Sequence, residues 1–517
     1  MPSKLNLIQE YNKYKRKAKI NFLNNNIERA LHQIEYCALL TTYYPIFYNY
    51  IDDELETLLI SISGNIFSNK SLTIESTFQN KVVFYNTQVV DAGALTEQYL
   101  EYFTENNFQI LFIVQNQNNV INGLETVKKI RNNTNIAFFT PKTTNYITEI
   151  KEISEKIIEF SPSLAFLHFL PHDVIGFCSF ALLNNIKRYY IVHNDHTFWL
   201  GKNCSDHFIE FRNHGYKIAI ERRNIPKEKI SVIPYFPIIN KLSFQGFPFN
   251  SDNKIIGLSA AQLYKYFMDP DLQYFNIIKR LLIENDNFIF CLVGYANNQK
   301  YPKLISNYIK KNNLENKFFF LGKRNDFYDL VGKIDILFES YPLKGGLTLL
   351  YATEQKKAVV GIGNLKDHSG LTEDFLNISG YHQPQTLDEF YNESTRLIRD
   401  VNYRMKNAEC LSQNEFNKLT FSHKLTELLT STKAIHYSSA YTLKLDEDLV
   451  FNQYKNLRTS KYTILQFKYK KLYGYYGIVL SLLCMLNFQG FKYVSNRIIK
   501  KIFCPCKYPP LMNQRKK

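Results

Sequence analysis

Short apolar runs alternate with amphipathic stretches over residues 79–240. The runs have the length of buried strands, and the stretches between them carry apolar residues every three or four positions, as amphipathic helices do. The predicted strands occupy residues 81–86, 109–114, 136–139, 164–168, 188–192 and 230–233. Residues 174–184 are one of the predicted helices, and residues 208–211 fit either a helix or a strand. Strands that alternate with helices in this way predict a parallel, doubly wound sheet.

The same alternation returns at about residue 250 and continues to about residue 400. The strands predicted there occupy residues 254–259, 288–293, 318–321, 334–338 and 358–362. Residues 238–253 contain Pro248 and have asparagines near both ends, which is typical of a linker. We therefore expect two Rossmann-like domains, at residues 79–240 and 250–400.

Both ends of the chain are predicted to be helical. Residues 1–78 carry apolar positions at helical spacing, which fits one tetratricopeptide-like hairpin or a plain helical cap. Residues 401–517 form a helical extension whose stretch 473–488 is nearly all apolar. That stretch is shorter than the roughly 20 residues that a membrane span needs. Basic residues flank it, which fits a segment lying on an anionic membrane. A buried core helix is the alternative.

Composition excludes some classes of protein and leaves others open. The chain has 517 residues, of which 45% are hydrophobic and 21% charged, as in a globular protein. A net charge of +16 suits an anionic partner such as a nucleotide or a lipid surface, and it also fits a plain solvated basic surface. We expect no nucleic-acid partner, because no stacking-aromatic motif or helix-turn-helix is present.

The N-terminal residues and the cysteines point to the cytoplasm. Residues 1–19 are polar and basic, without the apolar segment of a secretory signal. The eight cysteines are scattered, and the one close pair, Cys504 and Cys506, lacks metal-ligand spacing. We expect a cytoplasmic location, with attachment to the inner face of the membrane as a further alternative.

A strand, a Gly-Gly turn and a helix follow one another between residues 334 and 354. Gly345 and Gly346 would let the backbone approach a phosphate, and the first free amides of the helix would bind it. Thr348 adds a hydroxyl donor. The competing interpretation is an ordinary helix entry. Lys265 follows the first strand of the same domain, where ligands bind in such sheets, and could neutralise a diphosphate.

A polar loop follows the predicted strand at residues 188–192. It contains His193, Asp195 and His196, which could supply a general base, and Trp199, the one tryptophan of the chain. A metal site between His193 and His196 lacks an evident third ligand, so we expect no metal. A purely structural polar loop is the remaining alternative.

Asp91 and Gly93 follow another strand, at residues 81–86. The carboxyl ends of parallel strands meet at one edge of a sheet, so these residues should lie on the same edge as His193. We group Asp91, Gly93 and Trp199 as a candidate loop region that contacts acceptor or donor.

Two stretches resemble a known family. The run Gln262-Leu-Tyr-Lys265, followed by Asp269-Pro-Asp271, resembles the O-GlcNAc transferase and bacterial cytoplasmic N-glycosyltransferase group. A later run from Glu339 to Thr348 resembles the group's segment of aspartate, two residues and proline, followed by Gly-His-Thr-Thr.

The resemblance implies a GT-B fold, with two doubly wound Rossmann-like domains facing a cleft and helical additions at both ends. It implies that Gln262 and Lys265 bind the donor, with the lysine on the diphosphate. Gly345 matches the motif glycine and Thr348 its second threonine. Gly346 stands where the group has histidine.

The sequence departs from GT-B patterns on the helix after the glycine turn. Tyr351 stands where many GT-B enzymes hold the donor ribose with a carboxylate, and Leu343 stands where retaining relatives have the first of two glutamates. Glu354, about one turn further on, is the alternative carboxylate.

The expected function is transfer of a sugar from a nucleotide-sugar donor to a glycan, lipid-linked or protein acceptor, without a cofactor. His196 or Asp195 would be the base of an inverting reaction, and the same loop would orient the sugars in a retaining one. The alternative is a non-catalytic GT-B-like partner that binds acceptor and stabilises an active subunit.

Overall fold

The computed structural model describes most of the chain to residue 457. The described residues are 2–47, 50–75, 80–89, 94–115, 124–239, 242–295, 300–344, 346–363, 381–431, 433–435 and 446–457, with Tyr462, Leu465 and Tyr469. Three candidate site residues, Asp91, Gly93 and Gly345, lie outside these ranges. The apolar stretch at residues 473–488 lies outside them as well.

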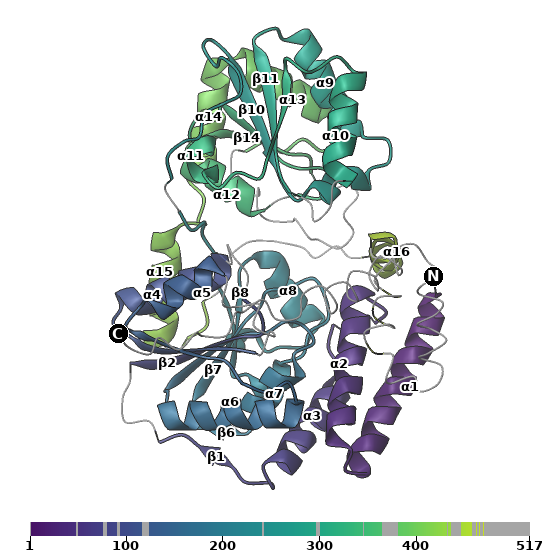
Figure 1. Cartoon of the computed structure of the whole chain (residues 1–517), viewed down its shortest axis with the longest axis vertical. Helices are drawn as coiled ribbons and strands as arrows, with labels where there is room; N and C mark the ends of the chain where they lie inside the picture. The colour runs from purple at the N-terminus through teal and green to yellow at the C-terminus, as the bar shows by residue number, and fades with distance from the viewer. Residues whose placement is uncertain are drawn as a thin grey trace, which may run out of the picture.

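The N-terminal domain is built on a seven-stranded parallel sheet (Figure 1). Its strands are β2 (Lys81–Asn86), β3 (Gln109–Val114), β4 (Ile136–Phe139), β5 (Leu164–His168), β7 (Lys187–Ile191), β8 (His207–Glu210) and β9 (Ile230–Val232). They lie in the order β4-β3-β2-β5-β7-β8-β9. The order reverses between β2 and β5, which makes this pair the topological switch point where doubly wound sheets bind ligands.

The helices of this domain agree with the pattern except at two places. They are α4 (Ala94–Glu105), α5 (Glu125–Arg131), α6 (Tyr146–Phe160), α7 (Val174–Phe180) and α8 (Asn213–Glu221). The helix predicted at residues 174–184 ends at Phe180, because β6 (Leu183–Asn184) pairs with β1 (Leu72–Thr73). The helix α8 was not predicted, and residues 208–211, left open between helix and strand, belong mostly to β8.

The C-terminal domain has a five-stranded parallel sheet. Its strands are β10 (Ile255–Ala260), β11 (Phe288–Val293), β12 (Phe318–Gly322), β13 (Ile336–Phe338) and β14 (Ala358–Val360). They lie in the order β12-β11-β10-β13-β14, so the switch point falls between β10 and β13. The helical elements are the 3-10 segment η4 (Leu263–Met268) and helices α9 (Gln273–Glu284), α10 (Lys300–Lys311), α11 (Phe327–Val331), α12 (Leu347–Glu354), α13 (Leu387–Arg399) and α14 (Val401–Ser412).

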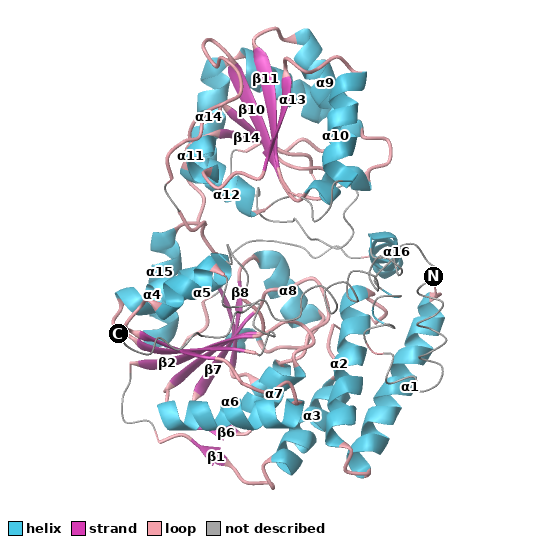
Figure 2. Ribbon diagram, viewed as in Figure 1, coloured by secondary structure: helices cyan, strands magenta, loops and turns pink. Residues whose placement is uncertain are grey.

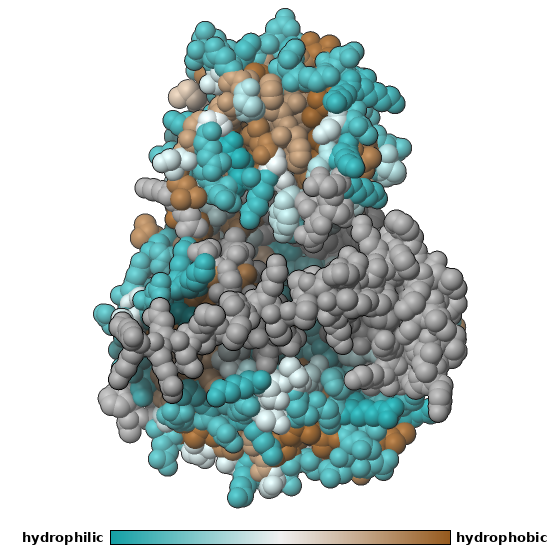
Figure 3. All heavy atoms as spheres, in the orientation of Figure 1, coloured by the Kyte–Doolittle hydropathy of each residue, from teal (hydrophilic) through white to brown (hydrophobic). Residues whose placement is uncertain are grey.

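Helices cover both faces of each sheet, as Figure 2 shows. Each sheet accordingly separates two hydrophobic clusters. On the face shown in Figure 3, hydrophilic side chains cover most of the described helices, and hydrophobic residues gather in the middle of the C-terminal domain. The expected α/β architecture of two doubly wound domains is confirmed.

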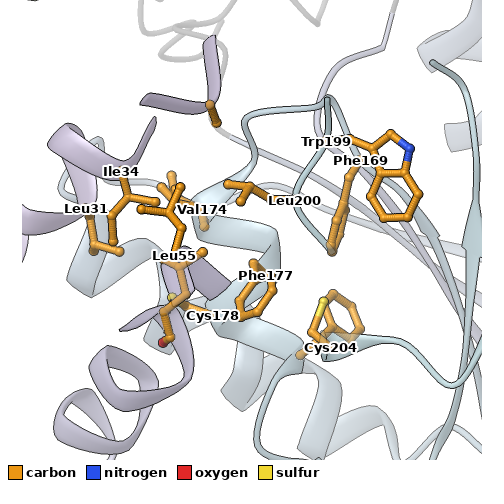
Figure 4. Packing of buried hydrophobic residues seen from close by; sticks show 14 of the residues in the cluster. Leu31, Ile34, Leu55, Phe169, Val174, Phe177, Cys178, Trp199, Leu200 and Cys204 are labelled. Atoms are coloured by element: carbon orange, nitrogen blue, oxygen red, sulfur yellow. Dashed lines mark hydrogen bonds between the residues drawn. The ribbon is translucent and has the colours of Figure 1, made fainter. Parts of the chain in front are cut away.

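Helical additions from both ends of the chain pack on the N-terminal domain. The first three helices are α1 (Lys4–Leu23), α2 (Ile27–Tyr43) and α3 (Asp53–Ile66). Figure 4 shows Leu31, Ile34 and Leu55 of these helices beside Val174 and Phe177 of α7, all within one buried cluster. The N-terminal helices are therefore part of the core of this domain.

Two later helices return to the same domain. The helix α15 (Lys418–Ser431) crosses back to α4, where the hydroxyls of Tyr102 and Thr426 are 2.8 Å apart. The helix α16 (Glu447–Leu457) lies beside α1, where Lys4 Nζ is 2.9 Å from Asp448 Oδ1. None of the helices within the described ranges is long and apolar enough to cross a bilayer.

Candidate functional site

The carboxyl ends of the two sheets are turned toward each other. In Figure 1, α8, which follows β8, and α12, which follows β13, both lie on the side of their domain that faces the other domain. The Tyr351 hydroxyl of α12 donates at 3.0 Å to the carbonyl of Ile238, at the start of the segment that links the domains. Ligand-binding edges of two doubly wound sheets are thus brought together.

Lys265 lies in η4, five residues beyond the end of β10, near the switch point of the C-terminal sheet. Its Nζ donates a hydrogen bond to the Lys344 carbonyl at 2.7 Å. Burial lowers the pKa of the Lys265 amine, and the charge of Glu339 opposes that shift. Lys265 therefore reaches the loop before α12, and its predicted role in binding a diphosphate stays a prediction.

Glu339 and Lys344 complete a charged cluster at the same place. Glu339 is the first residue after β13 and is 2% exposed, and its Oε2 lies 3.7 Å from Lys344 Nζ. Neither oxygen of its carboxylate has a hydrogen-bond partner among the described residues. Burial raises the pKa of Glu339, while Lys344 and Lys265 act in the opposite direction. Two ammonium groups and one carboxylate thus meet at the switch point, leaving an excess positive charge for an anion.

The helix α12 begins beside this cluster. Gly346, its N-terminal flanking residue, has φ 62° and ψ −81°, a backbone conformation that glycine adopts at little steric cost. Thr348 is the second residue of the helix, so Gly346 and Thr348 lie on the same edge of the sheet as Lys265.

Two other predicted donor residues lie apart from the cluster. Gln262 is exposed, and its amide donates to the Tyr295 hydroxyl at 3.2 Å. Glu354 is exposed at the last residue of α12, about 10 Å along the helix axis from its start at about 1.5 Å per residue. Tyr351, at the position where GT-B enzymes often have a ribose carboxylate, is engaged with Ile238.

On the N-terminal domain, Asp195 connects His196 to Arg212. Asp195 is fully buried, and its Oδ1 lies 2.9 Å from His196 Nδ1. Arg212 donates to the same carboxylate from Nε at 2.5 Å and from Nη2 at 3.0 Å. Burial alone would raise the pKa of Asp195, but Arg212 and His196 hold it well below its usual range. Asp195 therefore stays ionised and is placed to orient His196.

Arg223 holds the backbone of the loop that contains Asp195 and His196. Its Nη2 donates to the Asp195 carbonyl at 2.8 Å and to the Thr197 carbonyl at 2.7 Å. Its guanidinium lies 4.7 Å from the ring centroid of Trp199, which is 1% exposed and stacks on Tyr190. Trp199, predicted to contact acceptor or donor, is a core residue that supports the loop.

Glu210 is the last residue of β8 and lies close to Asp195 of the same loop. It is fully buried, and burial raises the pKa of its carboxyl to about 8, with Arg223 acting against that rise. A Cβ atom on Gly215 of α8 would collide with Glu210 Oε2 and lie 2.9 Å from Asp195 Cβ. The glycine therefore lets α8 approach the two carboxylates.

A second polar group occupies the switch point between β2 and β5. Asn86 donates to the Thr96 hydroxyl at 2.7 Å, and that hydroxyl lies 3.3 Å from His168 Nδ1. Burial lowers the pKa of His168 to about 3, so its imidazole stays neutral. The exposed His193 has its ring centroid 5.3 Å from that of His168. His193 thus reaches the switch point, while His196 is held by Asp195.

Residues of the described ranges contain no group of three or more His, Cys, Asp or Glu arranged to hold a metal ion.

Sequence reasoning missed Arg212, Glu210, Arg223 and Lys344. Two arginines in a row, Arg222 and Arg223, directly after α8, were the available signal for Arg223. Lys344 adjoins the glycine turn and was readable as a second cation of the phosphate site. Arg212 and Glu210 act through contacts with distant residues, which the sequence does not reveal.

Comparison with known proteins identifies the fold. No family model and no curated protein sequence matches the chain. Among solved structures, TarM of S. aureus matches with a TM-score of 0.52 and 10% identity over 69% of this chain and 100% of that chain. Anabaena HepE in complex with UDP matches with a TM-score of 0.50 and 17% identity over 68% of this chain and 100% of that chain. Similarity at these identities concerns architecture alone, and by architecture the chain has the GT-B fold of these glycosyltransferases.

Proposed function

We propose that the chain is a glycosyltransferase that moves a sugar from a nucleotide-sugar donor to a glycan, lipid-linked or protein acceptor. One observation carries the proposal: Lys265, Lys344 and the start of α12 converge on the switch point of the C-terminal sheet, and the carboxyl end of that sheet is turned toward the N-terminal domain, where Asp195 and His196 follow β7. This arrangement offers positive charge on one side and a proton acceptor on the other. The resemblance of both motifs to the O-GlcNAc transferase group supports the same assignment and stays a prediction.

The donor half acts on the leaving diphosphate. As negative charge grows on it, the ammonium groups of Lys265 and Lys344 and the first amides of α12 stabilise it. Each such interaction contributes roughly 3–4 kcal/mol to lowering the barrier. Gly346 lets the backbone approach the diphosphate, and Thr348 adds a hydroxyl. Since these groups supply the positive charge, the proposal requires no metal ion.

In the proposed reaction, the loop of Asp195 and His196 in the N-terminal domain acts on the nucleophile of the acceptor. Asp195 holds His196 by Nδ1, so Nε2 is the ring nitrogen that would take the proton of an acceptor hydroxyl or amide as the bond to the sugar forms. This is the inverting version of the reaction. In a retaining version the same loop orients the two sugars without taking a proton.

The test is donor turnover with a panel of nucleotide sugars. Uridine diphosphate sugars come first, because HepE was crystallised with UDP. Lys265→Ala should lower turnover about a hundredfold, which corresponds to about 2.7 kcal/mol, whereas Lys303→Ala, an exposed lysine on α10, should leave it unchanged. Equal turnover by wild type and a folded Lys265→Ala would remove Lys265 from the site. Absence of turnover with every donor and acceptor would reject the activity.

One observation favours a second candidate, the non-catalytic partner. The hydroxyl of Tyr351 is occupied by Ile238 at the position of the usual ribose carboxylate, and Glu354 lies at the far end of α12. Calorimetry with the same nucleotide sugars separates the candidates, since only the enzyme should release heat on donor binding.

A further inference from the structure

The outward face of α1 is basic and apolar. Its buried residues are Leu7, Tyr11, Tyr14 and Ala18. Opposite them, the helical spacing places an exposed row: Leu5, Gln9, Asn12, Lys13, Arg16, Ile20 and Leu23. The three apolar members are 62%, 49% and 80% exposed, in chain order. We refer to this row, with Lys17 and Arg29 at its edge, as the α1 face.

Positive charge on the α1 face is not balanced by nearby carboxylates. Lys13, Arg16, Lys17 and Arg29 take part in none of the ion pairs between described residues. Burial first, and then the like charges of Lys13, Arg29 and Arg16, lower the pKa of Lys17. Four cations therefore crowd one side of the helix.

The acidic residues around α1 are engaged elsewhere. Asp52 and Glu54 pair with Lys15, and Glu54 also pairs with Lys19, on another flank of the helix. Glu10, the one acidic residue of α1, accepts hydrogen bonds from Tyr36 and Tyr462. Among the described residues, these carboxylates therefore do not neutralise the charge of the α1 face, which can attract an anionic partner.

We propose that the α1 face binds an anionic membrane surface. The chain's own C-terminal residues are a poor occupant by charge, because residues 458–517 contain lysines and arginines but no Asp or Glu. A second copy of the chain would bring the same positive face. The occupant is therefore anionic.

Apolar side chains distinguish a lipid surface from an acidic protein. Leu5 lies near one end of α1 and Ile20 and Leu23 lie near the other, with the cations between them. A helix of 20 residues is about 30 Å long. Such a helix can lie flat in the headgroup region, with its apolar side chains inserted and its lysines and arginines on anionic lipid.

Vesicle flotation of the full chain tests the proposal. Wild type should float with phosphatidylcholine vesicles that contain about 30% phosphatidylglycerol, and much less with pure phosphatidylcholine, because surface attraction requires anionic lipid. The triple variant Lys13→Glu, Arg16→Glu, Lys17→Glu should lower the bound fraction at least tenfold. The control Lys303→Glu, Lys310→Glu, Lys311→Glu makes the same change of charge on exposed α10 and should float as wild type does.

A second variant keeps the charge and removes the apolar anchors. Ile20→Asn with Leu23→Asn should also weaken binding to the anionic vesicles, because it removes two side chains that would insert among the lipids. Both side chains are exposed, so the fold should be retained. Wild type that does not float, that floats equally with neutral vesicles, or that floats unchanged in either folded α1 variant would overturn the proposal. Binding of the α1 face to an acidic protein with no vesicle binding would overturn it as well.

Discussion

The guanidinium of Arg212 holds the carboxylate of Asp195 through two hydrogen bonds inside the N-terminal domain. Both side chains are almost completely buried. Arg212 directly precedes α8, and Asp195 belongs to the loop after β7, so the pair joins two segments that meet at the ligand edge of the sheet. The direction in which His196 points depends on this ion pair, because Asp195 Oδ1 also contacts its ring.

Loss of Arg212 should destabilise the fold. In Arg212→Met, the Asp195 carboxylate would be left charged and buried, which costs about 3–5 kcal/mol. Urea unfolding measures the change. The control Lys418→Met breaks exposed ion pairs to Glu101 and Glu105 and should cost less than about 1 kcal/mol. A loss of stability in Arg212→Met no larger than in this control would show that the buried pair contributes little.

His196 should matter for rate and not for donor binding. His196→Gln removes the proposed proton acceptor, so transfer should slow by about a hundredfold to ten-thousandfold while donor affinity stays unchanged. Initial rates at saturating donor, together with calorimetric donor affinity, give the two quantities. His423→Gln, at an exposed position of α15, is the matched control. Full activity in folded His196→Gln would exclude a base role for this residue.

Lys344 should contribute to diphosphate binding as Lys265 does. In Lys344→Met the cluster loses one of its two cations next to Glu339, so affinity for UDP should fall and transfer should slow about a hundredfold. Calorimetry with UDP measures the first effect, and the control is Lys303→Met. If wild type binds UDP and Lys344→Met binds it equally well, Lys344 serves only to neutralise Glu339.

The sequence was sufficient for the sheets because most strands are apolar on both faces. Residues 288–293 are buried from end to end, and residues 109–114 are buried except for Gln109. Such runs are recognisable without tertiary information. Helix α8 was not predicted because Asn213–Glu221 is short and contains Gly215, whose low helix propensity weakens the helical pattern. The glycine is needed for close approach to Glu210, which only the assembled structure reveals.

The site was predictable only where local chain geometry determines it. Lys265, Gly346 and Thr348 follow strand ends, so the parallel sheet brings them to one edge. The roles of Asp195 and Trp199 depend on side chains distant in sequence, such as Arg212 and Arg223. A pattern of residue types cannot separate a proton acceptor from a buried counter-ion, because the difference lies in those partners.

Gly215→Ala should disturb the contact between α8 and the loop. The added methyl group would collide with the Glu210 carboxylate and crowd Asp195, and overpacking of this kind costs about 1–3 kcal/mol. Urea unfolding again provides the measurement. Shortening the obstructing side chain supplies the control: Gly215→Ala with Glu210→Ser should be less destabilised than the sum of the two single variants. Strict additivity would mean that the methyl group meets no resistance from Glu210.

Glu210 should make stability fall as pH rises. The pKa of its carboxyl is raised by burial from about 4.5 to about 8, so between these values the folded protein binds a proton that the unfolded chain has lost. The free energy of unfolding therefore decreases with pH in this interval, by at most about 1.4 kcal/mol per pH unit for one proton. Below about pH 4.5 this contribution is fully present, and above about pH 8 it is lost.

Replacement of Glu210 by its neutral amide isolates that effect. Glu210→Gln cannot ionise, so its stability relative to wild type should rise steadily across the interval from about pH 4.5 to about 8. Urea unfolding of both proteins at several pH values gives the difference directly. The exposed glutamate variant Glu228→Gln should follow the wild-type profile, because its carboxyl is not buried. Parallel profiles for wild type and Glu210→Gln would mean that Glu210 is already ionised in the folded protein at neutral pH, stabilised by Arg223 and Arg212 despite its burial.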